Sequence, residues 1–263
     1  MIEIAARVSP SLARRELRAI GAAVCFLTRL PLGRLLTVDA DDLARAGATF
    51  PLVGAATGAL MGAIALLLVH PLGGWLAAVL ALAAATLLTG ALHLDALADS
   101  ADALSARTRE RALEIMRDHA IGSYGAVAIV LGLLLKAGAL STLALHHNVL
   151  RTAVAAGALS RAAPVLLASA LPYARAETGL GAPLTQGSRT RAAIAAALAA
   201  GIAIATAGTH GAIAAGVAAA IVVALTVCYR RWIGGITGDT LGAAVELTEI
   251  AVFLTAVGLI GVR

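Results

Sequence analysis

Charged side chains, aromatic rings and cysteines are all scarce in this sequence. Charged residues make up 13% of the 263 residues and aromatic residues 3%, and so little charge is untypical of a soluble domain. The shortage of aromatic rings leaves no stacking platform for nucleic-acid bases, so we expect no nucleic-acid partner. The two cysteines, Cys25 and Cys228, lie beside basic segments typical of the cytoplasmic side of a membrane. A structural disulfide is therefore not expected.

Apolar residues are abundant instead. They make up 60% of the chain, and the mean hydropathy is +0.91. A helix needs about 20 mainly apolar residues to cross the hydrocarbon core of a bilayer. The sequence predicts an all-α, polytopic integral membrane helical bundle, in which seven transmembrane helices cover residues 49–69, 75–94, 121–145, 148–171, 192–208, 211–228 and 241–262. No internal repeat or soluble domain interrupts it, so residues 1–263 are predicted to form a single integral membrane domain.

The basic residues indicate how the bundle is oriented. Most of the 20 Lys and Arg residues lie before the first span or in three later loops, at residues 107–117, 175–191 and 230–231. The alternate turns, near residues 70, 146 and 209, carry none. By the positive-inside rule the basic loops are cytoplasmic, which predicts a multi-pass protein of the bacterial inner membrane with a cytoplasmic active face. The basic loops also favour an anionic substrate.

The N-terminal segment, residues 1–46, is predicted to be cytoplasmic and interfacial, whereas residues 47–263 form the transmembrane bundle. Leu17, Ile20, Val24 and Leu27 follow one helical face, which is typical of a helix lying on a membrane surface. The segment lacks an Ala-x-Ala site, so it is not predicted to be a cleavable signal peptide.

Gly54, Gly58 and Gly62 recur at every fourth residue in the first predicted span. Such spacing lets a second helix approach closely. It predicts helix packing and says nothing about chemistry.

Three aspartates follow the second span. Asp95, Asp99 and Asp102 are spaced i, i+4 and i+7, so a helix places them on one face. Hard oxygen ligands of this kind suit Mg²⁺ bound against a phosphate. The alternative is a solvated helix end. We predict that the three residues are metal ligands.

A second acidic stripe, Glu110, Glu114 and Asp118, follows on a predicted cytoplasmic helix. Such a stripe is usually a solvated face. Asp118 differs because it precedes a Gly-Ser-Tyr-Gly turn whose backbone N–H groups can face a phosphate. It is a candidate catalytic residue.

A glycine-rich loop, residues 234–242, precedes the last span. Its glycines and the helix N-terminus that follows favour an anion, which makes Gly235, Thr237 and Gly238 candidate phosphate-binding residues. Asp239 is a candidate catalytic residue, with a simple N-cap as the alternative.

Four charged residues lie inside predicted spans: Lys136, Arg161, Glu246 and Glu249. A charged side chain inside a membrane costs free energy, so such residues are usually functional. Lys136 and Arg161 are candidate catalytic residues that offset phosphate charge, and structural pairing, for instance of Arg161 with Glu249, is the alternative. Arg151 lies close enough to a helix end to reach the interface.

The stretch from Thr89 to Asp102 resembles the signature of the cobalamin synthase family, the adenosylcobinamide-GDP ribazoletransferases. Ala91 and Ala96 occupy positions where the family pattern has glycine. Further stretches fit the family in order along nearly the whole chain, at residues 26–31, 50–54, 111–118, 121–125, 135–136, 172–175 and 237–243.

The resemblance implies the last assembly step of cobalamin biosynthesis. α-Ribazole, or its 5′-phosphate, attacks the cobinamide-linked phosphorus of adenosylcobinamide-GDP, GMP leaves, and adenosylcobalamin or its phosphate forms with Mg²⁺ as cofactor. Metal and in-line positioning are what such a displacement requires. In this interpretation Asp118 or Asp239 completes the metal shell or accepts the proton of the nucleophile.

Two other functions are compatible with membrane-embedded acids. A CDP-alcohol phosphotransferase carries an Asp-Gly-x2-Ala-Arg pattern, but here Ala103 follows Asp102 and the Ala-Arg spacing also fails. An ion-coupled transporter places polar residues near the midplane in broken helices. Here most acids cluster at one surface, which favours an enzyme.

Overall fold

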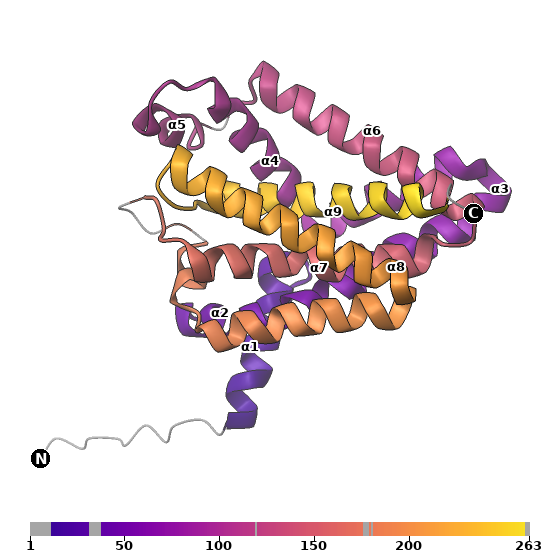
Figure 1. The fold of residues 1–263 in the computed structure, drawn as a ribbon, viewed down its shortest axis with the longest axis horizontal. Coiled ribbons are helices and arrows are strands. Elements are labelled where there is room, and N and C mark those ends of the chain that lie inside the picture. The colour runs from indigo at the N-terminus through magenta and orange to yellow at the C-terminus, as the bar shows by residue number, and fades with distance from the viewer. Residues whose placement is uncertain (1–11, 32–37, 119, 176–178, 180, 261–263) are drawn as a thin grey trace, which may run out of the picture.

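The computed structural model describes residues 12–31, 38–118, 120–175, 179 and 181–260. Over these residues the fold is helical, with one isolated backbone bridge between Tyr173 and Ile236. The helices, in chain order (Figure 1), are α1 Leu12–Leu27, α2 Ala40–Ala46, α3 Phe50–Thr89, α4 Leu92–Asp102, α5 Arg109–Ile115, α6 Ser123–Leu145, α7 Val149–Ala170, α8 Arg189–Trp232 and α9 Gly238–Ile260. Short 3₁₀ turns at Gly47–Thr49, Ala103–Ser105 and Ala182–Gln186 join them.

Five helical segments of the described chain are long and apolar enough to cross a membrane: residues 40–89, α6, α7, α8 and α9. The predicted all-α membrane fold is confirmed at this level. The count differs from the predicted seven because α3 and α8 each contain two of the predicted spans. A straight helix of 40 residues would be about 60 Å long, twice the thickness of the hydrocarbon core, so both helices must bend or leave the bilayer.

Both long helices break at a glycine where the two predicted spans meet. In α8 the break is Gly208, with φ 58° and ψ −130°. A Cβ placed on Gly211 would lie only 3.0 Å from the backbone nitrogen of Ile204, so the chain doubles back there. Figure 1 shows the two arms of α8 running in opposite directions from this turn.

In α3 the break is Gly73, with φ 76° and ψ 162°. The two ends of α3 both lie at the end of α1: Phe26 stacks on Phe50 with ring centroids 5.7 Å apart, and the Arg29 backbone N–H donates to the carbonyl of Leu88 at 2.7 Å. A helix whose two ends meet the same neighbour folds back on itself.

Helix α7 is the most buried of the long helices and packs against α3, α8 and α9. Its contact with α3 uses the predicted glycine series. A Cβ on Gly58 would lie 2.7 Å from the carbonyl carbon of Ala153, and one on Gly62 would lie 2.8 Å from the Cα of Leu150. The prediction that these glycines allow close helix approach is confirmed.

The N-terminal helix α1 forms as predicted, but its apolar face is divided. Leu17 and Ile20 are 66% and 43% exposed, whereas Leu27 is buried with Ala22 and Ala23 in the core that α1 shares with α3 and α7. The C-terminal half of α1 is therefore part of the bundle.

Candidate active site

The aspartate series lies on a separate helix rather than at the end of a span. Residues 75–94 were predicted to form one span, but α3 ends at Thr89. Gly90 and Ala91 then adopt left-handed backbone, with φ 65° and 59°. This conformation suits glycine and is unfavourable for alanine. The turn redirects the chain so that α4 starts a new direction at Leu92.

Within α4 the three aspartates have different environments. Asp95 is exposed, Asp99 is partly buried, and Asp102 is 8% exposed. Asp102 accepts hydrogen bonds from the backbone N–H groups of Gly122 and Gly125, each at 2.8 Å, and so uses both carboxylate oxygens to hold the start of α6. A carboxylate at a helix N-terminus stabilises the unpaired N–H groups there.

Asp95 lines a cavity of about 500 Å³ between α4, the start of α9 and the loop that follows α7. Its polar lining comes from three places in the chain: His93 and Asp95, then Tyr173 and Arg175, then Asp239. Apolar side chains of α1, α3, α4 and α9 complete the wall, among them Phe26, Phe50, Leu92, Leu241 and Val245. The cavity thus combines acids, one guanidinium and a broad apolar surface, which suits a large ligand that carries phosphate.

The glycine-rich loop forms the N-terminus of α9. Thr237 and Thr240 exchange hydrogen bonds between side chain and backbone N–H at 2.8 and 3.2 Å, so Thr237 is the N-cap. The alternative that Asp239 serves as the N-cap is therefore excluded. Asp239 instead accepts a hydrogen bond from Arg175 at 2.7 Å and faces the cavity.

The other predicted loop residues have different positions. Gly238 lines the cavity, whereas Gly235 and Thr237 are buried. Gly235 lies in close backbone contact with Pro172, next to the bridge between Tyr173 and Ile236. These contacts fix the loop after α7 against the start of α9.

Arg175 and Tyr173 were not among the predicted site residues. The buried Nε of Arg175 has no hydrogen-bond acceptor among the described residues, so the guanidinium keeps a donor for a ligand in the cavity. Burial raises the pKa of the Tyr173 phenol above its ordinary value, which keeps it a neutral hydrogen-bond donor. The only sequence signal was the Pro-Tyr-Ala-Arg stretch after the fourth predicted span.

Lys136 and Arg161 do not line this cavity. Lys136 Nζ lies 2.6 Å from Glu246 and 3.6 Å from Glu249, and Arg161 pairs with Glu249. These four side chains, which we call the charge quartet, are all 4–6% exposed. Two positive and two negative charges balance, as buried charges require. His93 connects the two regions, since it lines both the cavity and a small space beside the charge quartet.

Asp118 also lies outside the lining of the cavity. It is exposed in the turn after α5, where its carboxylate accepts a hydrogen bond from the backbone N–H of Ala120 at 3.1 Å. Its predicted catalytic role stays a prediction.

The described residues contain no group of three His, Cys, Asp or Glu side chains close enough to hold a metal ion by themselves. Mg²⁺ commonly uses only one or two carboxylates and takes its other ligands from water and substrate phosphates. Asp95 and Asp99, one helical turn apart with Asp95 at the cavity, fit such a shared site. Asp102 fits less well because both of its oxygens already accept hydrogen bonds.

Comparison with known proteins gives a consistent result. The family model described as Cobalamin-5-phosphate synthase matches residues 19–257. The adenosylcobinamide-GDP ribazoletransferase of Klebsiella pneumoniae strain 342 is 41% identical over 244 residues, covering 90% of this chain and 98% of that protein. The Escherichia coli K12 strain DH10B protein of the same name is 40% identical over 242 residues, covering 89% and 97%. No solved structure matches. The chain therefore belongs to the cobalamin-5-phosphate synthase family.

Proposed function

We propose that this protein joins adenosylcobinamide-GDP to α-ribazole, or to α-ribazole 5′-phosphate, and releases GMP. The relatives named adenosylcobinamide-GDP ribazoletransferase match this chain over nearly their whole length. The observation in the structure that carries the proposal is the cavity, where Asp95 and Asp239 from separate helices lie with Arg175 around a space of about 500 Å³. The product is adenosylcobalamin or its 5′-phosphate.

The reaction exchanges one phosphorus–oxygen bond for another. A ribazole oxygen bonds to the cobinamide-linked phosphorus, the bridging bond to the GMP phosphate breaks, and GMP leaves with the bridging oxygen. When a hydroxyl is the nucleophile, its proton must pass to a base. We assign that role to Asp239, which accepts a hydrogen bond from Arg175, and we assign the neutralisation of phosphate charge to Arg175, whose Nε has no acceptor among the described residues.

Asp95 and Asp99 would hold Mg²⁺ together with substrate phosphates, and the ion would neutralise charge that develops on the leaving phosphate. Gly238 at the start of α9 adds a helix N-terminus, which favours the same anion. We assign Asp102 to positioning α4 against α6, and Lys136 and Arg161 to positioning through the charge quartet. The apolar wall suits the large cobinamide ring system.

We further propose that the chain crosses a bacterial inner membrane seven times, with the cavity on the cytoplasmic side and the exposed start of α1 on the membrane surface. The breaks at Gly73 and Gly208 lie where predicted spans meet. Two of the basic loops are at the cavity, since Arg175 lines it and Arg109 donates to the neighbouring Ala174 carbonyl. A cysteine at Ser188 should then react with a label only from the cytoplasm, and one at His147 only from outside. The reverse pattern would refute this orientation.

The activity is tested with purified protein in nanodiscs by measuring GMP release from adenosylcobinamide-GDP. Release should require both α-ribazole and Mg²⁺, and Asp95→Asn should lower it at least tenfold. Asp41→Asn is the matched control because Asp41 is exposed on α2, outside the cavity. GMP release that does not depend on α-ribazole would identify a hydrolase and overturn the proposal. If no product forms, and the protein in liposomes instead moves an ion or solute across the membrane, a transporter would be favoured.

A further inference from the structure

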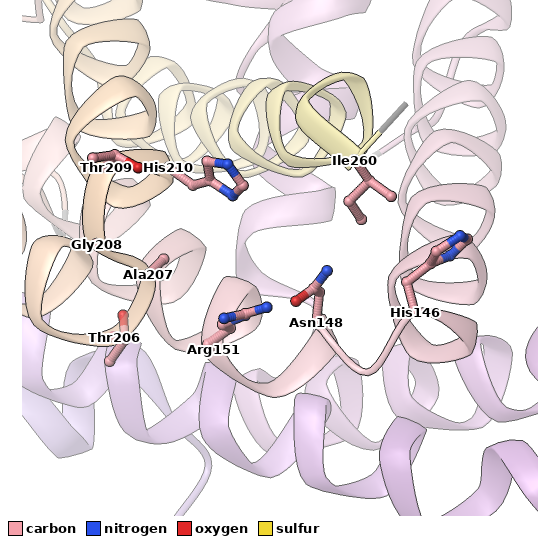
Figure 2. A pocket seen from close by; sticks show the side chains of 9 residues that line it. All are labelled: His146, Asn148, Arg151, Thr206, Ala207, Gly208, Thr209, His210 and Ile260. Atoms are coloured by element: carbon pink, nitrogen blue, oxygen red, sulfur yellow. The ribbon is translucent and has the colours of Figure 1, made fainter. Parts of the chain in front are cut away.

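A second cavity of about 500 Å³ lies at the far end of the bundle. Figure 2 shows its lining, which comes from the turn between α6 and α7, the fold-back of α8 at Gly208, and Ile260 at the end of α9. Gly238 lines the first cavity and Ile260 the second. A rise of 1.5 Å per residue along α9 separates the two cavities by about 33 Å, close to the thickness of the hydrocarbon core.

Six of the nine residues that line the second cavity are polar, and none of the described ones is a carboxylate: His146, Asn148, Arg151, Thr206, Thr209 and His210. In Figure 2 the Arg151 guanidinium and the His210 ring extend into the space between the helices. Arg151 makes no salt bridge with any of the described residues. An arginine with no carboxylate partner in the described part of the chain, at a membrane boundary, favours an anionic ligand, and the planar guanidinium suits phosphate.

Asn148 adds a second requirement. Its side-chain oxygen is buried and has no hydrogen-bond donor among the described residues, and an unpaired buried acceptor is costly. A ligand that supplies hydroxyl donors beside its anion would satisfy both residues. Exposed apolar side chains lie next to the lining residues in the sequence: Leu145 precedes His146, Leu150 precedes Arg151, and Ile204 lies two residues before Thr206. They are 61%, 39% and 49% exposed, so they can contact hydrocarbon chains.

We propose that this cavity binds the head group of an anionic phospholipid whose phosphodiester pairs with Arg151 and whose head-group hydroxyls donate to Asn148. Phosphatidylglycerol has this chemistry. The acyl chains would lie along these exposed leucine and isoleucine side chains. The site is separate from the cavity of the proposed reaction and does not depend on it.

The test is native mass spectrometry of the full chain, released from detergent in the presence of phosphatidylglycerol or phosphatidylcholine. Wild type should retain phosphatidylglycerol in preference to phosphatidylcholine. Arg151→Gln should weaken retention about tenfold or more, because a charge-assisted hydrogen bond is lost. Arg231→Gln, which makes the same charge change in the last turn of α8, more than 20 residues beyond the fold-back at Gly208, should retain the lipid as wild type does. Arg151→Lys, which keeps the charge, should retain an intermediate amount.

Asn148→Leu tests the hydroxyl contact. It should weaken phosphatidylglycerol binding and leave phosphatidic acid, which lacks head-group hydroxyls, unchanged. Equal retention by wild type and Arg151→Gln would overturn the proposal. So would displacement of the lipid by millimolar glycerol phosphate, because the site would then take a free phosphate ester rather than a lipid. The melting temperatures of all variants are measured without lipid. Values equal to that of wild type exclude misfolding as the cause of weaker lipid retention.

Discussion

The charge quartet allows a decisive test of whether Lys136 is structural or catalytic. Lys136→Met leaves Glu246 without its partner at 2.6 Å, in a site where both side chains are about 5% exposed. Removing one member of a buried ion pair costs about 3–5 kcal/mol. On the scaling known for soluble domains of this size, the melting temperature should fall by roughly 10 °C.

The matched variant removes both charges of the pair. Lys136→Met with Glu246→Gln leaves Arg161 and Glu249 as a balanced pair. Because replacing a whole buried ion pair by neutral side chains is often close to neutral, the double variant should recover most of the lost stability. If Lys136 only positions the helices, the double variant should also recover GMP release.

Thermal unfolding and GMP release are measured on the same preparations. A double variant that melts like wild type but releases no GMP would refute the positioning role and support the catalytic role first predicted from the sequence. A single Lys136→Met variant with unchanged stability would show that the charge quartet does not hold α6 against α9.

Three further predictions concern the backbone. Asp102→Asn should destabilise the protein by about 1.5–3 kcal/mol in thermal unfolding, because the carboxylate accepts two backbone N–H groups, and Asp95→Asn should not. Gly58→Ala should lower the melting temperature because its Cβ would meet the Ala153 carbonyl, whereas Gly216→Ala, which meets nothing within 4 Å, should raise it slightly. Ala91→Gly should stabilise by about 1 kcal/mol by relieving a left-handed alanine, and an unchanged melting temperature would contradict that turn.

The parts of the fold that the sequence predicted well are those set by local patterns. Apolar length alone located the helices, and the spacing of Gly54 and Gly58 identified the interface with α7. The sequence also separated the spans that meet at Gly73 and Gly208, but it did not show that helix continues on both sides of a single glycine there, because a lone glycine in an apolar run gives no reliable signal of how sharply the chain turns.

The site was predicted in part. Asp95 and Asp239 were both proposed from the sequence, and the structure brings them to one cavity. The partners of Lys136 lie 110 residues or more away, a distance over which no spacing rule applies. For the same reason the sequence did not predict the hydrogen bond between Arg175 and Asp239. Nor did it predict that the carboxylate of Asp102 accepts hydrogen bonds from two backbone N–H groups.

The separation of Asp95 and Asp239 depends on how α4 and α9 pack. Asp95 precedes Ala96, and Asp239 lies about one turn before Gly242. A Cβ on Gly242 would clash with the Cβ of Ala96, so the two helices are in contact at this point. Gly242 provides the room for the methyl group of Ala96. The two acids therefore reach one cavity from helices that meet at two small residues, one residue away from Asp95 and three from Asp239.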